Sequence, residues 1–469
     1  MQQDFAREVL SRLPLAEAVL ILWRWVADEF FLHSLFARHR EAGYEKVLSF
    51  AVLVQLVVDA LLEHRGSGRQ SFTRARERGE LAASVQAVYQ KLGRVPLGLS
   101  EAWLAESTER VRSVYSPGAT LAVPPSVQEF RVFVVDGKAI KRVAKRLKPL
   151  RGRKGGVLGG KALVALELAS GLAVAMATDL DGETNEAKLV PALLPQVRRR
   201  VAGPRLWVAD RQFCDLTQPA AFATDTDHFL VRYHPKTHFC PDPTRPAHQG
   251  IDPQGRAWVE DWGWLGCERA KQRRFVRRIT LYRPGEEMLI VITDLLDVEQ
   301  YPANDLLALY LARWGIERVF QQITEVFHLQ ALIGTTPQGT IFQLAFCLLL
   351  YNLLQVVRAY VATAQTRPPE TISTELLFAD VQRQLIALTE LVPAPAIEPL
   401  FEPCSSPDRV CEQLQRLLGT VWTPRWLKAP PKKPKPPTAR KATRGNQTSV
   451  YRLLAAYRHK QQEVTSPIQ

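Results

Sequence analysis

Apolar residues recur at helical spacing through the first 125 positions. One apolar helical face is formed by Leu10, Leu13, Leu15, Val19, Leu20 and Leu22. A second helix is expected from Glu45 to His64, and the Gly-Ser-Gly-Arg stretch at 66–69 ends it. The pattern therefore predicts a helical N-terminal region.

The pattern changes after Pro124-Pro125, where short apolar runs replace the helical periodicity. These runs predict five buried strands, at Phe130–Val135, Leu163–Leu168, Leu172–Ala177, Leu206–Ala209 and Phe229–Tyr233. Ser170-Gly171 is a hairpin turn between the second and third strands. Helices are expected at Glu183–Arg200 and before the fifth strand. The order predicts a mixed α/β sheet and is the one found in ribonuclease-H-like domains.

Residues 234–300 lose the helical signal and read as a β-rich insertion, with strands at Ala257–Trp264, Phe275–Tyr282 and Met288–Thr293. Helices resume at Asn304–Leu329 and Ile341–Ala362. A tail rich in Pro, Lys and Arg follows, with a short helix near Val450–Gln461. The expected regions are 1–125 (helical, DNA-binding), 126–233 (core, first part), 234–300 (insertion), 301–370 (core, second part), 371–425 (helical) and 426–469 (basic tail).

Two segments are strongly apolar, Leu48–Leu62 and Ile341–Ala362. We interpret both as buried helices rather than membrane spans, because polar residues interrupt them. These are Gln55, Asp59, Gln343, Asn352, Gln355 and Arg358. The N-terminus also lacks a basic start followed by an uninterrupted apolar stretch, so we expect a cytoplasmic protein without membrane contacts.

The net charge of +14 over 469 residues favours a polyanionic partner, most simply nucleic acid. A soluble protein that is merely basic would explain the charge equally well. The six cysteines are scattered, and none forms a C-x-x-C pair. This pattern favours a reducing compartment, and His238, Cys240 and Cys267 match no usual zinc spacing.

Two aspartates follow predicted strands directly, Asp136 and Asp210. Ligand sites collect at the carboxyl ends of strands, and two such carboxylates on neighbouring strands could hold Mg²⁺ or Mn²⁺. The alternative is a turn-forming aspartate, because Asp136-Gly137 is also a good turn dipeptide. Glu183, Asn185 and Glu186 are expected to begin a helix rather than to bind a ligand.

A third acid lies on a predicted helix. Tyr310, Arg313 and Glu317 are spaced i, i+3 and i+7 and share one helical face. Glu317 on that face could complete a three-carboxylate cage for two metal ions, with Arg313 orienting it. The alternative is an ordinary surface salt bridge between Arg313 and Glu317.

These residues resemble the DDE transposases of the insertion sequence 4 family. That family carries Tyr, two residues, Arg, three residues, Glu, six residues and Lys. Tyr310, Arg313 and Glu317 match this motif, and Thr324 stands at the Lys position. The family's aspartates follow apolar strands, as Asp136 does in Val-Val-Asp-Gly-Lys and Asp210 does in Trp-Val-Ala-Asp-Arg. The resemblance covers roughly residues 130–360, including the β-rich insertion.

The resemblance implies a transposase that binds terminal inverted repeats and performs metal-dependent DNA cleavage and strand transfer. Asp136, Asp210 and Glu317 would hold two Mg²⁺ (or Mn²⁺) ions per active site. The partners would be double-stranded DNA, at the transposon ends and the target, and a second copy of the chain, in a bacterial cytoplasm at the nucleoid. In the family the Lys contacts DNA. Because Thr324 stands at that position, there are two alternatives. Another cation, such as Arg318 or Lys138, replaces the family Lys, or the activity of this copy is impaired.

Further DNA contacts are expected around these acids. Basic residues crowd the segment from Lys138 to Lys154, which suggests phosphate contacts or else a solvated loop. Similar transposases hold a flipped base on a tryptophan of the insertion, although alternating tryptophans more often pack a small β core. The expected DNA-binding residues are Tyr310, Arg313, Lys138, Lys141, Arg142, Arg211, Trp262 and Thr324.

Two competing functions share these features. A nuclease of the same fold without strand joining would need the same three acids. A DNA-binding protein descended from a transposase could have lost catalysis. A carboxylate enzyme that works without metal, such as a glycosidase, is disfavoured by the basic charge.

Overall fold

The computed structural model describes residues 2–43, 45–116, 118, 120–141, 143–224, 226–327, 329–331, 333–401, 406–429 and 447–465. The N-terminal region is helical, as the sequence predicts. Its helices are α1 (Gln2–Ser11), α2 (Pro14–Val26), α3 (Glu29–His39), α4 (Phe50–Leu62), α5 (Gly68–Glu77), α6 (Val85–Leu92) and α7 (Leu97–Ser113).

Local signals set the ends of these helices. Pro14 starts α2, so the predicted apolar face from Leu10 to Leu22 is divided between two helices. Ser49 caps α4 by accepting a hydrogen bond from the Val52 amide at 3.1 Å, and the helix therefore begins later than the predicted Glu45. Ser67 caps α5 in the same way, directly after the predicted break.

The predicted strands form one half of a mixed sheet, in the order β4-β3-β1-β5-β6. Strands β1, β5 and β6 run parallel, whereas β3 is antiparallel to both β1 and β4. The strands are β1 (Arg131–Ala139), β3 (Lys161–Glu167), β4 (Ala173–Asp179), β5 (Arg205–Ala209) and β6 (Asp227–Arg232). The hairpin between β3 and β4 is confirmed, with Gly171 at a φ of 69°. The mixed α/β architecture is therefore confirmed.

Residues 234–300 are rich in strands, and these strands continue the same sheet. Antiparallel pairing of β11 with β6 joins them to the core, followed by β10 and β9. Two short strands that the sequence pattern did not predict, β7 and β8, both pair with β9. The strands are β7 (Phe239–Pro241), β8 (His248–Ile251), β9 (Ala257–Leu265), β10 (Arg274–Leu281) and β11 (Leu289–Thr293). Ten strands of the described chain thus share one sheet.

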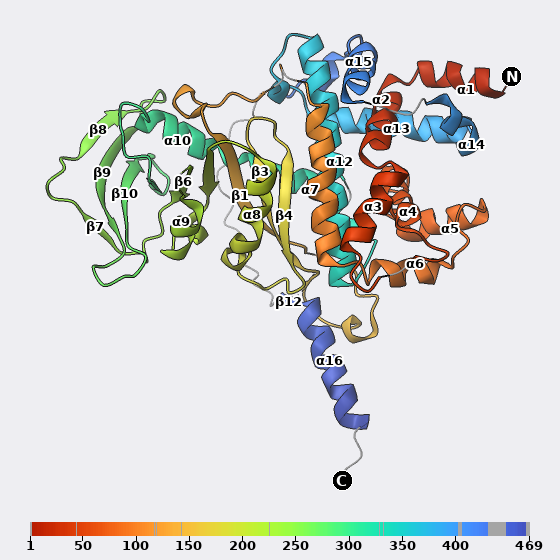
Figure 1. Ribbon diagram of the computed structural model, residues 1–469, viewed down its shortest axis with the longest axis horizontal. Helices are drawn as coiled ribbons and strands as arrows, with labels where there is room; N and C mark the ends of the chain where they lie inside the picture. The colour runs from red at the N-terminus through yellow and green to blue at the C-terminus, as the bar shows by residue number, and fades with distance from the viewer. Residues whose placement is uncertain are drawn as a thin grey trace.

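Helices pack on the sheet and link it to the N-terminal region. Following η3 (Glu186–Leu189), α8 (Val190–Arg200) packs on β3 and β4, and α9 (Thr217–Phe222) packs on β6. Figure 1 shows α7 and α12 side by side between the sheet and the N-terminal helices. The later helices are α10 (Ala303–Ala312), α11 (Gly315–Glu325), α12 (Pro337–Ala364), α13 (Thr374–Leu391), α14 (Ala394–Ile397) and α15 (Pro407–Leu418).

The end of the chain returns to the sheet region. β12 (Thr448–Ser449) pairs with β2 (Val157–Leu158), and α16 (Val450–Thr465) then extends away from the rest of the molecule (Figure 1). The helix expected near Val450–Gln461 is therefore confirmed. Most of the basic tail, residues 430–446, lies outside the described residues.

Helix α12 runs through the middle of the core. Within the described residues it is the one helix long and apolar enough to cross a membrane, yet its apolar stretch is fully buried in the protein. Its buried Asn352 accepts a hydrogen bond from the Ala173 amide of β4 and donates to the Ala173 carbonyl and to Thr108 of α7, each at 2.9 Å. One amide thus ties two helices to the edge strand.

We expect Asn352→Leu to lower the free energy of unfolding by about 2–4 kcal/mol, because it leaves the polar groups of Ala173 and Thr108 buried without partners. The measurement is chemical denaturation of the purified chain. Gln415→Leu, on an exposed face of α15, is the matched control and should change stability little. Equal stability of the two variants would contradict a structural role for Asn352.

Candidate active site

Asp136 and Asp210 lie next to each other at the end of the parallel part of the sheet. Val135 and Ala209 form the last pair between β1 and β5, and each aspartate directly follows its member of this pair. Parallel strands bring their carboxyl ends to the same edge of a sheet, so the two aspartates lie on adjacent strands at that edge. The arrangement predicted from the sequence is present.

The sequence pattern predicted that the strand would end just before Asp136, but β1 continues beyond it. It continues to Ala139 through antiparallel pairing with β3, in which Asp136 faces Val164. Gly137 is therefore extended backbone, and the interpretation of Asp136-Gly137 as a turn is wrong. The polar residues after Val135 hid this part of the strand, because only the pairing with β3 supports it.

The predicted helix around Glu317 is interrupted. Helix α10 ends at Ala312, and α11 begins at Gly315. Tight i to i−3 hydrogen bonds join the amides of Arg313 and Trp314 to Tyr310 and Leu311 across the break. Arg313 is the C-cap of one helix and Glu317 lies in the first turn of the next, so they do not share a continuous helical face.

Arg313 contacts two of the three acids. Its guanidinium is 3.3 Å from the Glu317 carboxylate and 3.8 Å from that of Asp136. Its side chain is only 6% exposed, whereas that of Glu317 is 44% exposed. Burial alone would lower the pKa of Arg313, but Tyr310 and the carboxylates of Asp136, Asp210 and Glu317 raise it. Arg313 therefore joins all three acids electrostatically.

Asp136 is largely buried, and this burial changes its titration. Burial raises the pKa of Asp136 to about 7, Arg313 and the Gly137 amide oppose the rise, and Asp210 and Glu186 add to it. Asp210 caps the short helix η4 (Arg211–Phe213), because its carboxylate accepts a hydrogen bond from the Gln212 amide at 2.8 Å. Buried negative charge at Asp136 thus needs a cation close by.

Tyr310 does not lie on the surface. It is 1% exposed, and the Arg313 guanidinium is 5.6 Å from the centre of its ring. Burial raises its pKa to about 12. The expected DNA contact at Tyr310 is therefore wrong, because its ring packs in the core and supports Arg313 instead.

A cavity of about 920 Å³ opens between β1 and α11, beside the acids. It is lined by charged side chains of both signs, Asp136, Glu186, Glu317 and Glu325 against Lys138, Lys141 and Lys161, and Thr324 also lines it. The Lys138 ammonium donates to the Thr324 hydroxyl at 2.9 Å. Lys138 rather than the exposed Arg318 therefore stands next to Thr324.

The other expected DNA-binding residues differ in their settings. Lys141 is exposed and lines the cavity. Arg211 is half exposed and 3.6 Å from Glu287, and Arg142 lies outside the described residues. Trp262 is 5% exposed and packs against His248, so it lacks the open ring face that base stacking requires. The packing alternative for Trp262 is therefore the one that the structure supports.

One acid near the site was missed as a site residue. Asn185 caps η3, as expected for a helix start, and Glu186 begins that helix. Glu186 is also buried in the cavity wall, 2.6 Å from the Lys161 ammonium. A Cβ at Gly137 would lie 1.9 Å from the Glu186 carboxyl carbon, so any larger residue there would have to displace the end of the Glu186 side chain. The one sequence signal for this contact is that glycine.

The three carboxylates have the right chemistry for a divalent cation, because hard oxygen donors are what Mg²⁺ and Mn²⁺ prefer. Within the described residues, however, no group of three or more His, Cys, Asp or Glu side chains is close enough to hold a metal ion. The Arg313 guanidinium stands among them. A metal cation bound here and Arg313 would together neutralise the carboxylates of Asp136 and Glu317.

Comparisons with known proteins agree with this chemistry. Residues 128–353, just under half of the chain, match a protein-family model described as a transposase DDE domain, which supports a DDE transposase. A solved structure of the piggyBac transposase synaptic complex with hairpin DNA is 11% identical, covers 87% of this chain and 85% of that chain, and gives a TM-score of 0.35. At that score the likeness carries no argument. A search of curated proteins finds no match.

The buried carboxyl of Asp136 predicts a pH-dependent stability in metal-free protein. Its folded pKa near 7 lies above the ordinary 3.8, so stability is lost as pH rises through the ordinary value and the loss is complete above about 7. We expect Asp136→Asn to raise the free energy of unfolding by about 1–2 kcal/mol at about pH 8, and by less at about pH 5.

Denaturation curves in EDTA at the two pH values measure this difference. Glu317→Gln is the control, because its carboxylate is 44% exposed and largely hydrated. A gain from Asp136→Asn that does not grow with pH would show that Asp136 is not buried in its charged form.

Proposed function

We propose that this protein is a DDE transposase of the insertion sequence 4 type, which binds terminal inverted repeats and performs cut-and-paste DNA transposition. The observation that carries the proposal is the placement of Asp136 and Asp210 after the paired ends of adjacent strands β1 and β5, with Arg313 joining Asp136 to Glu317. All four residues lie inside the segment that matches the transposase DDE domain. The net charge of +14 agrees with a nucleic-acid partner.

The proposed core is ribonuclease-H-like. Its support is the strand order β4-β3-β1-β5-β6, with three parallel strands beside an antiparallel hairpin. The first two acids follow the adjacent strands β1 and β5, and the third comes from a helix later in the chain. The β-rich segment between the second and third acids, which extends the sheet from β6, also supports the proposed insertion.

In this proposal Asp136, Asp210 and Glu317 are the catalytic and metal-binding residues. Two bound Mg²⁺ or Mn²⁺ ions would supply an activated water and stabilise the leaving oxygen in phosphoryl transfer. Arg313 opposes the rise in the pKa of Asp136 and holds the exposed Glu317 toward it, through contacts of 3.8 and 3.3 Å. Lys138 and Lys141 give the adjacent cavity wall positive charge for the DNA backbone.

The two alternatives make different demands on this site. A DNA-binding protein that had lost catalysis would have no need to keep three acids converged on one arginine. A nuclease without strand joining would need the same site, so the products distinguish it. The partners that the proposal implies are double-stranded DNA, at the transposon ends and the target, and a second copy of the chain for synapsis, in a bacterial cytoplasm.

The test uses a plasmid that carries the DNA flanking this reading frame on both sides. We expect the full chain to nick and excise this DNA in Mg²⁺ or Mn²⁺, and EDTA to abolish the reaction. Asp136→Asn, Asp210→Asn and Glu317→Gln should each reduce cleavage by at least about 1,000-fold, because each removes an anionic ligand. Binding to the same DNA in EDTA should persist.

The pattern of outcomes separates the three functions. Cleavage retained in all three variants would exclude these acids as the catalytic site. Cleavage without joining of the freed ends to a second plasmid would indicate a nuclease. DNA binding without cleavage by the unmodified chain would indicate a protein that has lost catalysis. Glu325→Gln, on the same helix and lining the same cavity, is the matched control and should keep most activity.

A further inference from the structure

Lys138 has an unusual setting in the cavity wall. It lies two residues after Asp136 on β1, so both side chains leave the same face of the strand. Its ammonium crosses to α11, where it donates to the Phe320 carbonyl at 3.2 Å and to the Thr324 hydroxyl at 2.9 Å. The same ammonium is 5.5 Å from the centre of the Phe320 ring.

Thr324 is oriented to receive this ammonium. Its hydroxyl donates to the Phe320 carbonyl at 2.6 Å, which leaves the oxygen lone pairs free to accept from Lys138. Two neutral oxygens of α11, the Thr324 hydroxyl and the Phe320 carbonyl, therefore hold the Lys138 ammonium in place. An ammonium has three N–H donors, and these contacts use two of them.

The charge of Lys138 has no matching carboxylate in contact. Within the described residues it forms no ion pair, and the acids that favour its charged form, Asp136 and Glu325, act at longer range. Lys161, another lysine of the cavity wall, is by contrast neutralised by Glu186 at 2.6 Å. Lys138 is therefore a fixed positive charge next to the acids.

We propose that Lys138, positioned by Thr324, binds the phosphate of the DNA strand next to the scissile bond. This inference rests on the proposed transposase function and adds a phosphate-positioning residue to its active site. A partly desolvated, pre-oriented ammonium binds an anion more strongly than a mobile surface lysine, because less conformational entropy is lost on binding. Thr324 thus acts through Lys138, and the cation comes from β1 rather than from α11.

The first test is binding. A fluorescein-labelled duplex from the flanking DNA is titrated with the full chain in EDTA, at several salt concentrations. Lys138→Met should weaken binding by roughly 10-fold and reduce the slope of log K against log salt by about 0.9, as expected for one lost phosphate contact. Lys141→Met is the matched control. As an exposed lysine of the same cavity, it should weaken binding less.

The second test is an exchange of the two side chains. The double variant Lys138→Thr with Thr324→Lys places the ammonium in the same gap from the helix side. We expect Lys138→Thr alone to lower cleavage of the flanking-DNA plasmid by roughly 10-fold, and the exchange to restore most of it together with the salt slope. Thr324→Val keeps the shape but removes the acceptor, and it should cause a smaller loss.

The outcomes separate this inference from the proposed function. If Lys138→Met binds and cleaves like the unmodified chain, the phosphate contact is wrong. If cleavage falls while the salt slope is unchanged and the exchange restores nothing, the role of Lys138 is structural and the inference is also wrong. If the unmodified chain never cleaves, the transposase proposal fails, whereas a reduced salt slope in Lys138→Met would still support the phosphate contact.

Discussion

The burial of helix α12 is the constraint on which the rest of the structure depends. This helix contacts α2, α7, α11, α13, α15 and β4, so it connects the N-terminal helices, the sheet and the C-terminal helices. Its apolar side chains are buried away from water on every face of the helix. Asn352 provides a hydrogen-bond partner for the backbone of the edge strand β4 inside the core. A helix of this composition is stable in water only inside such a shell of other elements.

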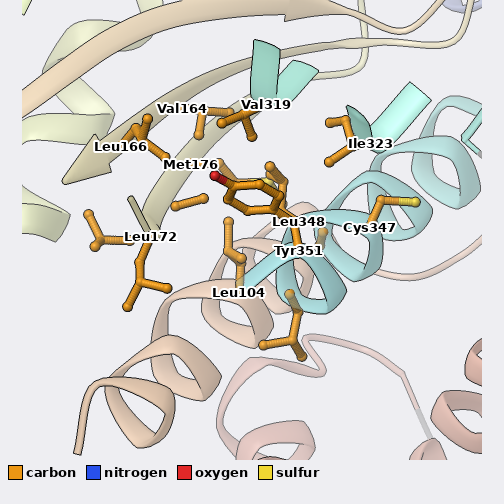
Figure 2. Packing of buried hydrophobic residues seen from close by; sticks show 14 of the residues in the cluster. Leu104, Val164, Leu166, Leu172, Met176, Val319, Ile323, Cys347, Leu348 and Tyr351 are labelled. Carbon is orange, nitrogen blue, oxygen red and sulfur yellow. The ribbon is translucent and has the colours of Figure 1, made fainter. Parts of the chain in front are cut away.

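The same core places the candidate active site. Figure 2 shows Val319 and Ile323 of α11 packed with Leu348 and Tyr351 of α12, near Val164 of β3. Because one face of α11 is buried in this way, the other face turns toward the cavity and carries Glu317, Thr324 and Glu325. Helix α11 thus acts as the wall opposite β1. The distance between Lys138 and its two acceptors on α11 is set by apolar packing that contains no site residue.

The sequence predicted what depends on burial and missed what depends on pairing or charge. Continuous apolar runs identified the core strands, because strands buried on both faces need such runs. The extension of β1 past Asp136 has no apolar signal, since pairing with β3 alone supports it. The break between α10 and α11 was hidden because Arg313 and Trp314 are compatible with a helix, and only Gly315 signals an end. The contact of Glu186 with Gly137 depends on two distant segments and has no local pattern.

Charge balance, rather than a motif along one helix, describes this site best. The Tyr-Arg-Glu-Lys motif expects a lysine at position 324. The electrostatic interaction with an anion depends only on where the positive charge lies, and not on which residue carries it. The side chain of Lys138 reaches that point from the neighbouring strand and finds a hydroxyl there, and a second lysine at 324 would crowd two ammonium groups together. Arg313 fulfils the same requirement for Asp136 and Glu317, which its guanidinium contacts at 3.8 and 3.3 Å. Each cationic side chain is partly buried where its own strand or helix places it. Because Lys138 supplies the positive charge near position 324, a threonine there is consistent with an intact site.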